Sequence, residues 1–247
     1  MDYGLIGKTL VHSYSKIIHS MIGDYSYELV SLAPETLDGF MREKAFKGIN
    51  VTIPYKKDVI PYCSEITDRA RRIGSVNTIV NREGRLLGHN TDYDGFAAMA
   101  KRAGISFAGR HVLILGSGGT MLTARTVAED MGASDITVIS RKGPVTYADL
   151  PAYYGADILI NTTPVGMFPH TEESPVDLGH FTNLQGVLDV IYNPKETKLV
   201  GQARALGIPA ENGLYMLVVQ AVKAAELFFE KEFPEALCER IYLDMPL

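Results

Sequence analysis

Cysteine is scarce in this chain of 247 residues, which holds only Cys63 and Cys238. Two cysteines cannot form a disulfide framework, and their separation does not fit the spacing of metal ligands. This scarcity fits a reducing compartment, so the sequence predicts a cytoplasmic protein without a metal site.

Long apolar runs and positively charged tracts are also missing. The strongest candidate for a membrane span, 214–222, is broken by Gln220, whereas a spanning helix needs about 20 apolar residues. The first seven residues lack the basic region and apolar core of a secretory signal. The net charge is −5, and the arginines at 69, 71 and 72 fit a solvated helix face. We therefore expect neither membrane insertion nor nucleic-acid binding.

The composition that is present is that of a globular protein, with 46% hydrophobic and 21% charged residues. The length allows one large domain or two moderate ones. In the first part of the chain, apolar patterning predicts strands at 3–6, 27–30, 50–53, 77–81 and 85–87, with helices at 17–22, 36–45 and 67–73. This alternation predicts an α/β domain.

The segment 48–57 carries the first candidate for chemistry. Asn50 and Thr52 alternate with Val51 and Ile53, which predicts a strand with one buried face and one face lined by hydrogen-bonding groups. The proline at 54 ends the strand and leaves Lys56 at its mouth, where a lysine can act as an acid or base. The alternative is a strand with a solvated polar face and solubilising lysines.

Two further turn-rich segments, 74–79 and 88–95, place Asn77 and Asp92 beside glycines. Three polar segments that converge would suit a sugar-like substrate, because each buried hydroxyl needs a hydrogen-bond partner. The alternative for either residue is an Asx-turn or a helix N-cap, and Asp92 does precede a helical pattern.

The second part of the chain opens with an apolar strand at 111–115, a glycine turn and a helix at 121–131. This order is typical of dinucleotide binding, in which backbone N–H groups at a helix N-terminus meet a pyrophosphate. Met121 stands where the usual motif has its third glycine. The alternative is a tight turn without a ligand. The predicted cofactor residues of the turn are Gly116, Ser117, Gly118, Gly119 and Thr120.

The end of the next strand, 135–139, indicates which dinucleotide binds. An acidic residue there would suit NAD, but the chain has Ser140, Arg141 and Lys142, whose positive charges suit the 2′-phosphate of NADP. These residues could instead be ordinary surface residues. Strands at 158–160 and 187–190 follow, and ligands lie beyond the carboxyl ends of such strands. We therefore assign Thr163 and Val190, at these strand ends, to the cofactor. Gly213 is also assigned to the cofactor.

Taken together, these motifs resemble the shikimate dehydrogenase family over nearly the whole chain. The matching segments occur in family order at 12–15, 50–56, 75–78, 90–92, the glycine turn, 161–163, 189–192 and 212–220. The resemblance implies NADPH-dependent, reversible reduction of 3-dehydroshikimate to shikimate on the route to chorismate and the aromatic amino acids. It implies that Lys56 and Asp92 form the catalytic pair and that the substrate is surrounded by Ser13, Ser15, Thr52, Asn77, Asp92, Tyr192 and Gln220.

The implied fold class is α/β with two α/β domains, an N-terminal substrate domain and a Rossmann-type doubly wound NADP-binding domain. The first would span residues 1–95, completed by C-terminal helices within 222–247, and the second residues 96–221. An acidic residue at 68 aligns with a family position near the cofactor, although a helix cap is an equal alternative. The oligomeric state is left open, with a homodimer as one candidate.

The chain departs from the family pattern in three places. Lys16 and Ser20 replace the usual proline and asparagine, Lys142 replaces a threonine, and the crossover after Arg141 is shorter than usual. The short crossover predicts an open adenine side and weaker NADPH affinity. The remaining alternatives are a quinate or aminoshikimate dehydrogenase using NAD(P), a folate-pathway dehydrogenase, and an NADP-binding sensor without turnover. Ser15 favours shikimate over quinate, and the Lys56–Asp92 pair favours an enzyme over a sensor.

Overall fold

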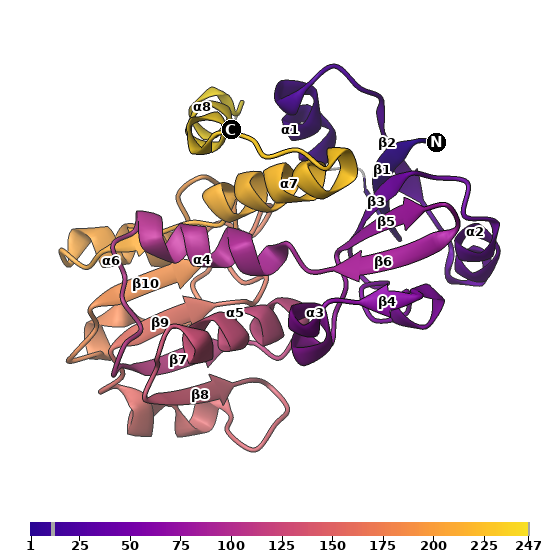
Figure 1. Cartoon of the computed structure of the whole chain (residues 1–247). Helices are drawn as coiled ribbons and strands as arrows, with labels where there is room; N and C mark the ends of the chain where they lie inside the picture. Colours follow the sequence, from indigo (N-terminus) through magenta and orange to yellow (C-terminus); the bar gives the residue numbers. More distant parts are fainter. Residues whose placement is uncertain (11–12, 247) are drawn as a thin grey trace. The chain divides into compact units, whose positions relative to one another are not determined.

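The computed structural model describes residues 1–10 and 13–246. The described residues divide into two compact units, Met1–Asp92 with Val218–Met245, and Tyr93–Leu217 with Pro246. Each unit has its own sheet (Figure 1). Among the described residues, no helix is both long and apolar enough to cross a membrane.

The first unit is built on a mixed six-stranded sheet in the order β2-β1-β3-β5-β6-β4. Its strands are β1 (Tyr3–Gly7), β2 (Tyr27–Ser31), β3 (Gly48–Val51), β4 (Glu65–Ile66), β5 (Thr78–Arg82) and β6 (Arg85–His89). β1 runs parallel to β2 and β3, whereas β5 runs antiparallel to β3 and β6. The helices that begin in this part of the chain are α1 (Ser15–Ile22), α2 (Leu37–Glu43) and α3 (Asp68–Ile73), with short turns of 3-10 helix at η1 (Pro34–Thr36) and η2 (Ile60–Tyr62).

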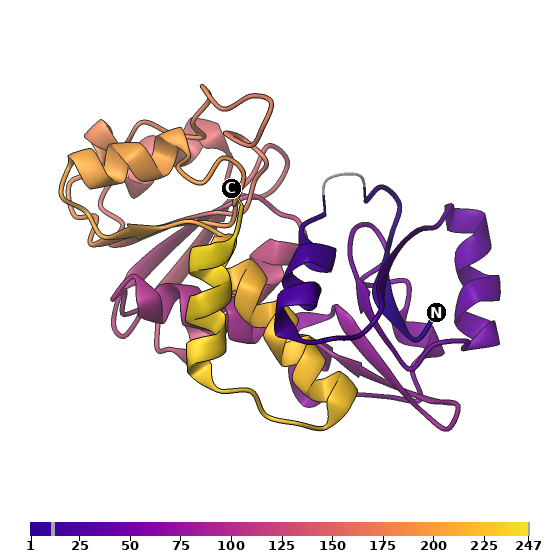
Figure 2. The same cartoon turned by 90° about the horizontal axis from the view of Figure 1, so that it is seen from above.

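Apolar side chains cover both faces of this sheet. Successive residues on one strand point to opposite faces. Ile6 therefore packs with Met41 of α2, while its neighbour Leu5 packs on the other face with Phe228. Phe228 belongs to α7 (Leu214–Phe229), and α8 (Glu235–Asp244) lies against α1 (Figure 2). The C-terminal segment therefore completes the core of the first unit.

The strand predicted to carry Lys56 is shorter than its pattern suggested. β3 ends at Val51, and Ile53 is exposed rather than buried. The prediction of a buried Ile53 was wrong. The Thr52 N–H still bonds the Ile6 carbonyl of β1, but Ile53 already belongs to the turn that follows β3, and its side chain is exposed. Asn50 is buried, so the polar face of this strand is turned into the protein.

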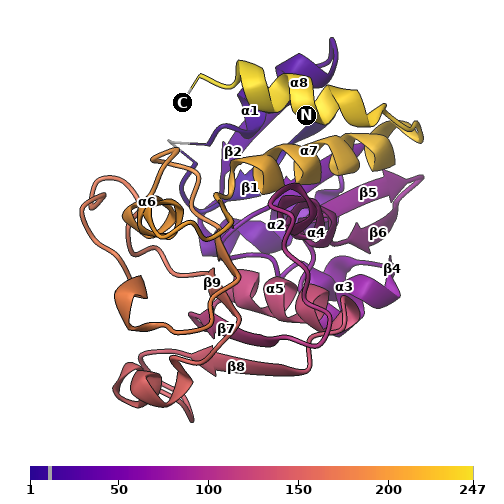
Figure 3. The same ribbon diagram turned by 90° about the vertical axis from the view of Figure 1, so that its left-hand side faces the viewer.

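The second unit is a five-stranded parallel sheet in the order β11-β10-β9-β7-β8. Its strands are β7 (His111–Leu115), β8 (Asp135–Ile139), β9 (Ile158–Asn161), β10 (Gly186–Asp189) and β11 (Ala210–Glu211). Figure 3 labels β7, β8 and β9. The helical elements are α4 (Asp92–Arg102), whose first residue belongs to the first unit, α5 (Gly119–Asp130), α6 (Lys198–Ala205), η3 (Tyr147–Tyr153) and η4 (Leu178–His180).

Helices cover both faces of this second sheet. On β7, Val112 and Ile114 pack with α4 and α5, whereas Leu113 and Leu115 pack with η3 and α6. A strand buried on both faces has no polar side, which is why 111–115 is a continuous apolar run. The predicted fold class, two α/β units of which the second is doubly wound, is confirmed.

Candidate active site and dinucleotide turn

Lys56 and Asp92 form a close ion pair in the first unit. Lys56 lies in the turn after β3, Asp92 is the first residue of α4, and Lys56 Nζ donates to Asp92 Oδ2 at 2.5 Å. The two side chains are only 21% and 12% exposed. Limited solvent around a charge pair strengthens its electrostatic interaction, so the lysine is held at a defined position where a substrate oxygen could meet it.

Asn77 holds the other oxygen of the same carboxylate. Its Nδ2 donates to Asp92 Oδ1 at 2.9 Å and reaches Gln220 Oε1 at 3.5 Å. The backbone N–H of Thr91 donates to Asn77 Oδ1 at 2.7 Å. Because a backbone N–H can only donate, this bond fixes which end of the Asn77 amide faces Asp92. The structure thus brings four of the predicted residues together: Lys56, Asn77, Asp92 and Gln220.

The remaining hydroxyl residues of the first unit lie in the loops after β1 and β3. Ser15 begins α1, and its N–H donates to Ser13 Oγ at 3.3 Å. Thr52 follows β3 directly. Because β1 and β3 are parallel, both loops begin at the same end of the sheet, where these strands have their carboxyl ends. Tyr192 lies in the second unit, after β10. His12 of the family-like segment 12–15 lies outside the described residues.

Two threonines that the sequence reading did not assign to the site belong to this cluster. Thr91 Oγ1 accepts from Asn77 Nδ2 at 3.0 Å, and Thr78 Oγ1 donates to Asn77 Oδ1 at 3.1 Å. Both lie in the turn-rich segments already singled out, so their position next to Asn77 and Asp92 was the available signal. Asp68 is exposed, and the N-cap of α3 is Thr67, whose side chain accepts from Ala70 N–H.

The glycine turn of the second unit has the geometry of a phosphate-binding turn. Gly116 has φ +107°, which favours glycine, and a Cβ there would lie 2.7 Å from Thr162 Oγ1. A Cβ on Gly118 or Gly119 would meet nothing within 4 Å, and no side chain caps α5. Open space in front of uncapped N–H groups fits the pyrophosphate of a dinucleotide, with Ser117 and Thr120 flanking it.

The end of β8 fits a phosphorylated ribose. Ser140 is buried, and its Oγ donates to the carbonyl of Lys142 at 2.8 Å. This bond closes a tight turn whose next two side chains, Arg141 and Lys142, are exposed. The crossover that follows contains only η3, begun by a reciprocal cap between Thr146 and Asp149. Two exposed cations at a strand end are suited to a 2′-phosphate.

A buried carboxylate organises the loops after β9 and β10. Asp189 Oδ1 accepts from Asn161 Nδ2 at 3.0 Å and from Ile191 N–H at 3.1 Å, and Oδ2 accepts from Thr197 Oγ1 at 2.7 Å. Burial raises the pKa of Asp189 to about 6, with these hydrogen bonds opposing part of the shift. Asn161 Oδ1 in turn accepts from Thr163 Oγ1 at 2.7 Å, so one network shapes both loops.

Val190 and Gly213, both assigned to the cofactor, lie against each other in the second unit. A Cβ on Gly213 would lie 2.0 Å from the carbonyl oxygen of Val190. The N–H of Gly213 donates to the carbonyl of Ile191 at 2.9 Å. Only glycine allows this close approach of two backbone segments. Among the residues that the structure describes, no group of three or more His, Cys, Asp or Glu side chains could hold a metal ion.

His19 in the first unit gives a pH-dependent prediction. Burial lowers the pKa of His19 from 6.5 to about 3, with Asn50 opposing part of the shift. The unfolded chain therefore binds a proton at pH values where the folded chain does not, so this group's contribution to stability falls as pH drops below 6.5. At about 1.4 kcal/mol per pH unit, the loss between pH 7.5 and pH 5 is about 2 kcal/mol.

The measurement is urea unfolding of the wild type and His19→Gln at both pH values. The stability difference between the two proteins should shrink by about 2 kcal/mol at pH 5. The comparison with the variant is needed because Asp189, whose pKa is raised, contributes stability that is lost as pH rises through about 6. An unchanged difference at the two pH values would show that His19 takes up a proton as readily in the folded protein as in the unfolded chain.

A lysine that can act as an acid or base and a turn that can bind a dinucleotide are together suited to hydride transfer to or from a carbon that bears oxygen. The fold and the two sites therefore define a nicotinamide-dependent dehydrogenase. Residues 5–79 match the family model described as the shikimate dehydrogenase substrate binding domain.

Relatives and solved structures match the chain over nearly its full length. The shikimate dehydrogenase (NADP(+)) of Clostridium beijerinckii is 35% identical, over 97% of this chain and 96% of the relative. The structure of a chorismate mutase/shikimate 5-dehydrogenase fusion protein from Clostridium acetobutylicum is 36% identical, with a TM-score of 0.93 over 98% of this chain and 95% of that one. Quinate dehydrogenase from Corynebacterium glutamicum in complex with NAD is 27% identical, with a TM-score of 0.89 over 99% of both chains. The chain belongs to the shikimate dehydrogenase family, as its motifs predicted.

Proposed function

We propose that this protein catalyses the reversible, NADPH-dependent reduction of 3-dehydroshikimate to shikimate in the biosynthesis of chorismate and the aromatic amino acids. The observation that carries the proposal is the Lys56–Asp92 pair, held at 2.5 Å and bounded by the Asn77 amide. The curated relative at 35% identity is an NADP-dependent shikimate dehydrogenase, which supports the same cofactor here.

The chain's own residues supply the proton chemistry. NADPH, when bound, supplies the hydride that reaches the ketone carbon. Lys56 Nζ polarises the ketone oxygen and donates a proton to it, so that carbonyl, hydride and proton together give the alcohol. Asp92 keeps the ammonium group at that position and accepts a hydrogen bond from a substrate hydroxyl. In the oxidative direction, Lys56 as the neutral amine accepts the proton from the hydroxyl on the carbon that gives up the hydride.

The hydroxyl and amide groups around the pair account for substrate binding. We assign Ser13 and Ser15 to one polar end of the ring, and Thr52, Asn77 and Gln220 to its hydroxyls. Each polar group of the substrate needs such a partner, because an unpaired buried hydroxyl loses affinity. Tyr192 stays a prediction from the family resemblance.

The experiment is the oxidation of NADPH, followed at its nicotinamide absorbance, on addition of 3-dehydroshikimate. The proposal predicts stoichiometric loss of NADPH and appearance of shikimate. Binding of NADPH without its oxidation would contradict an enzyme and would instead support a sensor.

Arg141 gives a prediction about the cofactor. Replacing it by alanine should lower kcat/KM for NADPH about ten-fold while leaving the value for NADH unchanged, because an exposed charge-assisted bond to the 2′-phosphate is lost. Arg204→Ala, an exposed arginine of α6 paired with Glu196, is the matched control. An equal loss with both cofactors would show that Arg141 does not bind the 2′-phosphate.

A fluorescence titration with NADPH would test the weaker NADPH affinity that is expected from the short crossover after Arg141.

We also propose a cytoplasmic location. Cys63 and Cys238 are both free, and burial raises the pKa of each thiol to about 11. Such thiols are mostly protonated at neutral pH and unreactive, as suits a reducing compartment. The candidate homodimer stays a prediction, and light scattering on the purified protein tests it.

A further inference from the structure

A chain of hydrogen bonds runs through the interior of the first unit and ends on the Asp92 carboxylate. Tyr27 Oη donates to Asn50 Oδ1 at 2.7 Å, and Asn50 Nδ2 donates to Thr78 Oγ1 at 3.0 Å. Thr78 Oγ1 donates to Asn77 Oδ1 at 3.1 Å, and Asn77 Nδ2 donates to Asp92 Oδ1 at 2.9 Å. All five residues are buried, so the chain is shielded from water over its whole length.

Every bond in the chain donates in the same direction, toward Asp92. The Thr91 N–H fixes the Asn77 amide, and the bond from Asn50 Nδ2 to the carbonyl of Asn77, at 3.3 Å, fixes the Asn50 amide. Burial raises the pKa of Tyr27 well above its usual range, so its hydroxyl keeps the proton that it donates. Hydrogen bonds aligned in this way polarise one another and strengthen the last bond of the series.

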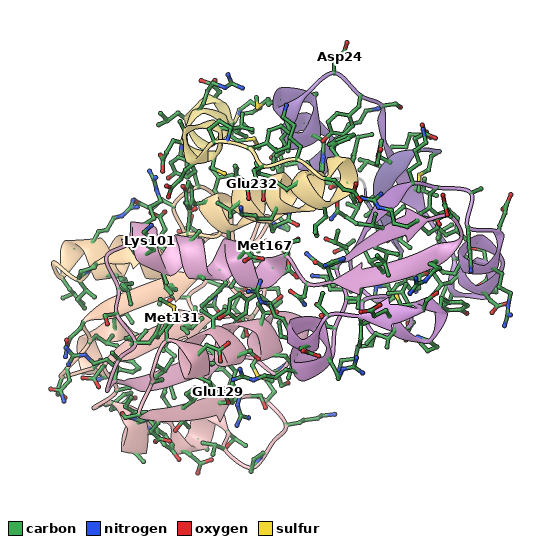
Figure 4. All side chains as sticks on the ribbon, viewed as in Figure 1. Asp24, Lys101, Glu129, Met131, Met167 and Glu232 are labelled. Carbon is green, nitrogen blue, oxygen red and sulfur yellow. The ribbon has the colours of Figure 1, made fainter. Side chains whose placement is uncertain are left out.

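The outer end of the chain is closed by an aromatic stack. The rings of Tyr27 and His19 lie 3.7 Å apart at an angle of 9°. His19 Nδ1 is hydrogen-bonded to the hydroxyl of Tyr25 at 2.6 Å. Tyr25 directly follows Asp24, which is labelled in Figure 4. Burial lowers the pKa of His19 to about 3, so the stack is neutral.

This series of hydrogen bonds is not suited to carry protons. Two of its links are the side-chain amides of Asn50 and Asn77, which donate and accept through different atoms and do not release a proton at neutral pH. What the series of hydrogen bonds can do is fix the rotation of the Asp92 carboxylate group. With Oδ1 of Asp92 bound to Asn77, the other oxygen, Oδ2, is the one that faces Lys56 Nζ.

We propose that Thr78, with Tyr27 and Asn50 behind it, is a positioning residue that sets the rotation of the Asp92 carboxylate and thereby the place of the Lys56 ammonium group. This inference rests on the proposed function, which gives Lys56 and Asp92 their roles. Thr78 is central because its single hydroxyl contacts Asn50, Asn77 and Thr91. Without it, the Asn77 side-chain amide keeps the Thr91 N–H but loses the hydroxyl that links it to the Asn50 side chain.

The test compares Thr78→Val, which keeps the shape and removes the hydroxyl, with Thr78→Ser, which keeps the hydroxyl. Turnover is measured with NADP and whichever of shikimate and quinate the wild type oxidises faster. We expect Thr78→Val to lower kcat about ten-fold with a change in KM below about three-fold, since small displacements of catalytic groups lower rates steeply. Thr78→Ser should stay within about two-fold of the wild-type kcat.

Tyr27→Phe serves as a second, milder variant, with an expected loss in kcat of about three-fold. It keeps the ring that stacks on His19. The inference can therefore still be tested with this variant if Thr78→Val does not fold. Circular dichroism and the dissociation constant for NADPH show whether each variant is folded.

Wild-type kcat in a folded Thr78→Val, or equal losses in the Val and Ser variants, would overturn the inference while leaving the proposed function in place. Absence of wild-type turnover on both substrates would instead refute the proposed function, and the positioning role with it.

Discussion

Replacing Lys56 by alanine lowers kcat at least about 100-fold, because general acid/base catalysis by a positioned side chain contributes about 10²- to 10⁴-fold. The ammonium group is the proton donor closest to Asp92 in the buried cluster, and alanine leaves no group in its place. Steady-state rates with shikimate and NADP give the kcat, and a titration of the inactive variant with shikimate gives its affinity. We expect shikimate still to bind, because the hydroxyl and amide groups around it are unchanged.

Lys57→Ala is the matched control for this experiment. Lys57 is the next residue along the chain and is exposed, so its loss changes the net charge equally without touching the Asp92 carboxylate. The control should keep the wild-type kcat. Turnover by Lys56→Ala at the wild-type rate would remove Lys56 from the mechanism.

Gly213→Ala should destabilise the second unit by about 3 kcal/mol, at the upper end of the usual effect of overpacking. The added Cβ would lie 2.0 Å from the Val190 carbonyl oxygen and 2.5 Å from its carbon. Both are backbone atoms, so no side-chain rotation can relieve the contact. The residue before it, Asn212, accepts from the Leu214 N–H at 2.8 Å at the start of α7, which limits movement on the other side.

Thermal and urea unfolding measure this loss, and Gly201→Ala controls for the change of residue type. Gly201 lies within α6 of the same unit, where a Cβ meets only the Glu196 side chain at 3.5 Å. Alanine in a helix interior is about 1 kcal/mol more favourable than glycine, so the control should be as stable as the wild type or more so. A Gly213→Ala protein of wild-type stability would mean that the 190 and 213 segments do not approach each other this closely.

The second unit was the easier part to predict from the sequence. β7 and β8 begin and end at the residues expected, because a parallel strand covered on both faces is a continuous apolar run bounded by turns. β3 was harder. Its alternating pattern continued to Ile53, but the ladder stopped at Val51, and only the pairing with β1 and β5 decides where a strand leaves a sheet.

The candidate site was predicted in part for a similar reason. Lys56, Asn77 and Asp92 stand out locally because each is a polar residue in a short segment that also holds glycine or proline. Thr78 and Tyr27 do not, since their role depends on register: antiparallel pairing places Asn50 opposite Thr78, 28 residues apart in the chain. If the pairing of β3 with β5 slipped by one residue, the Asn50 and Thr78 side chains would lie on opposite faces of the sheet. Nothing in the local sequence fixes that register.

The most direct test of the proposed function is a comparison of kcat/KM for shikimate and quinate, each with NADP and with NAD. Shikimate with NADP should give the highest value, because the proposal assigns Arg141 and Lys142 to the 2′-phosphate of NADP and takes Ser15 as a sign of shikimate preference. A preference for quinate with NAD would contradict the account, and would place the protein beside the quinate dehydrogenase that shares its fold.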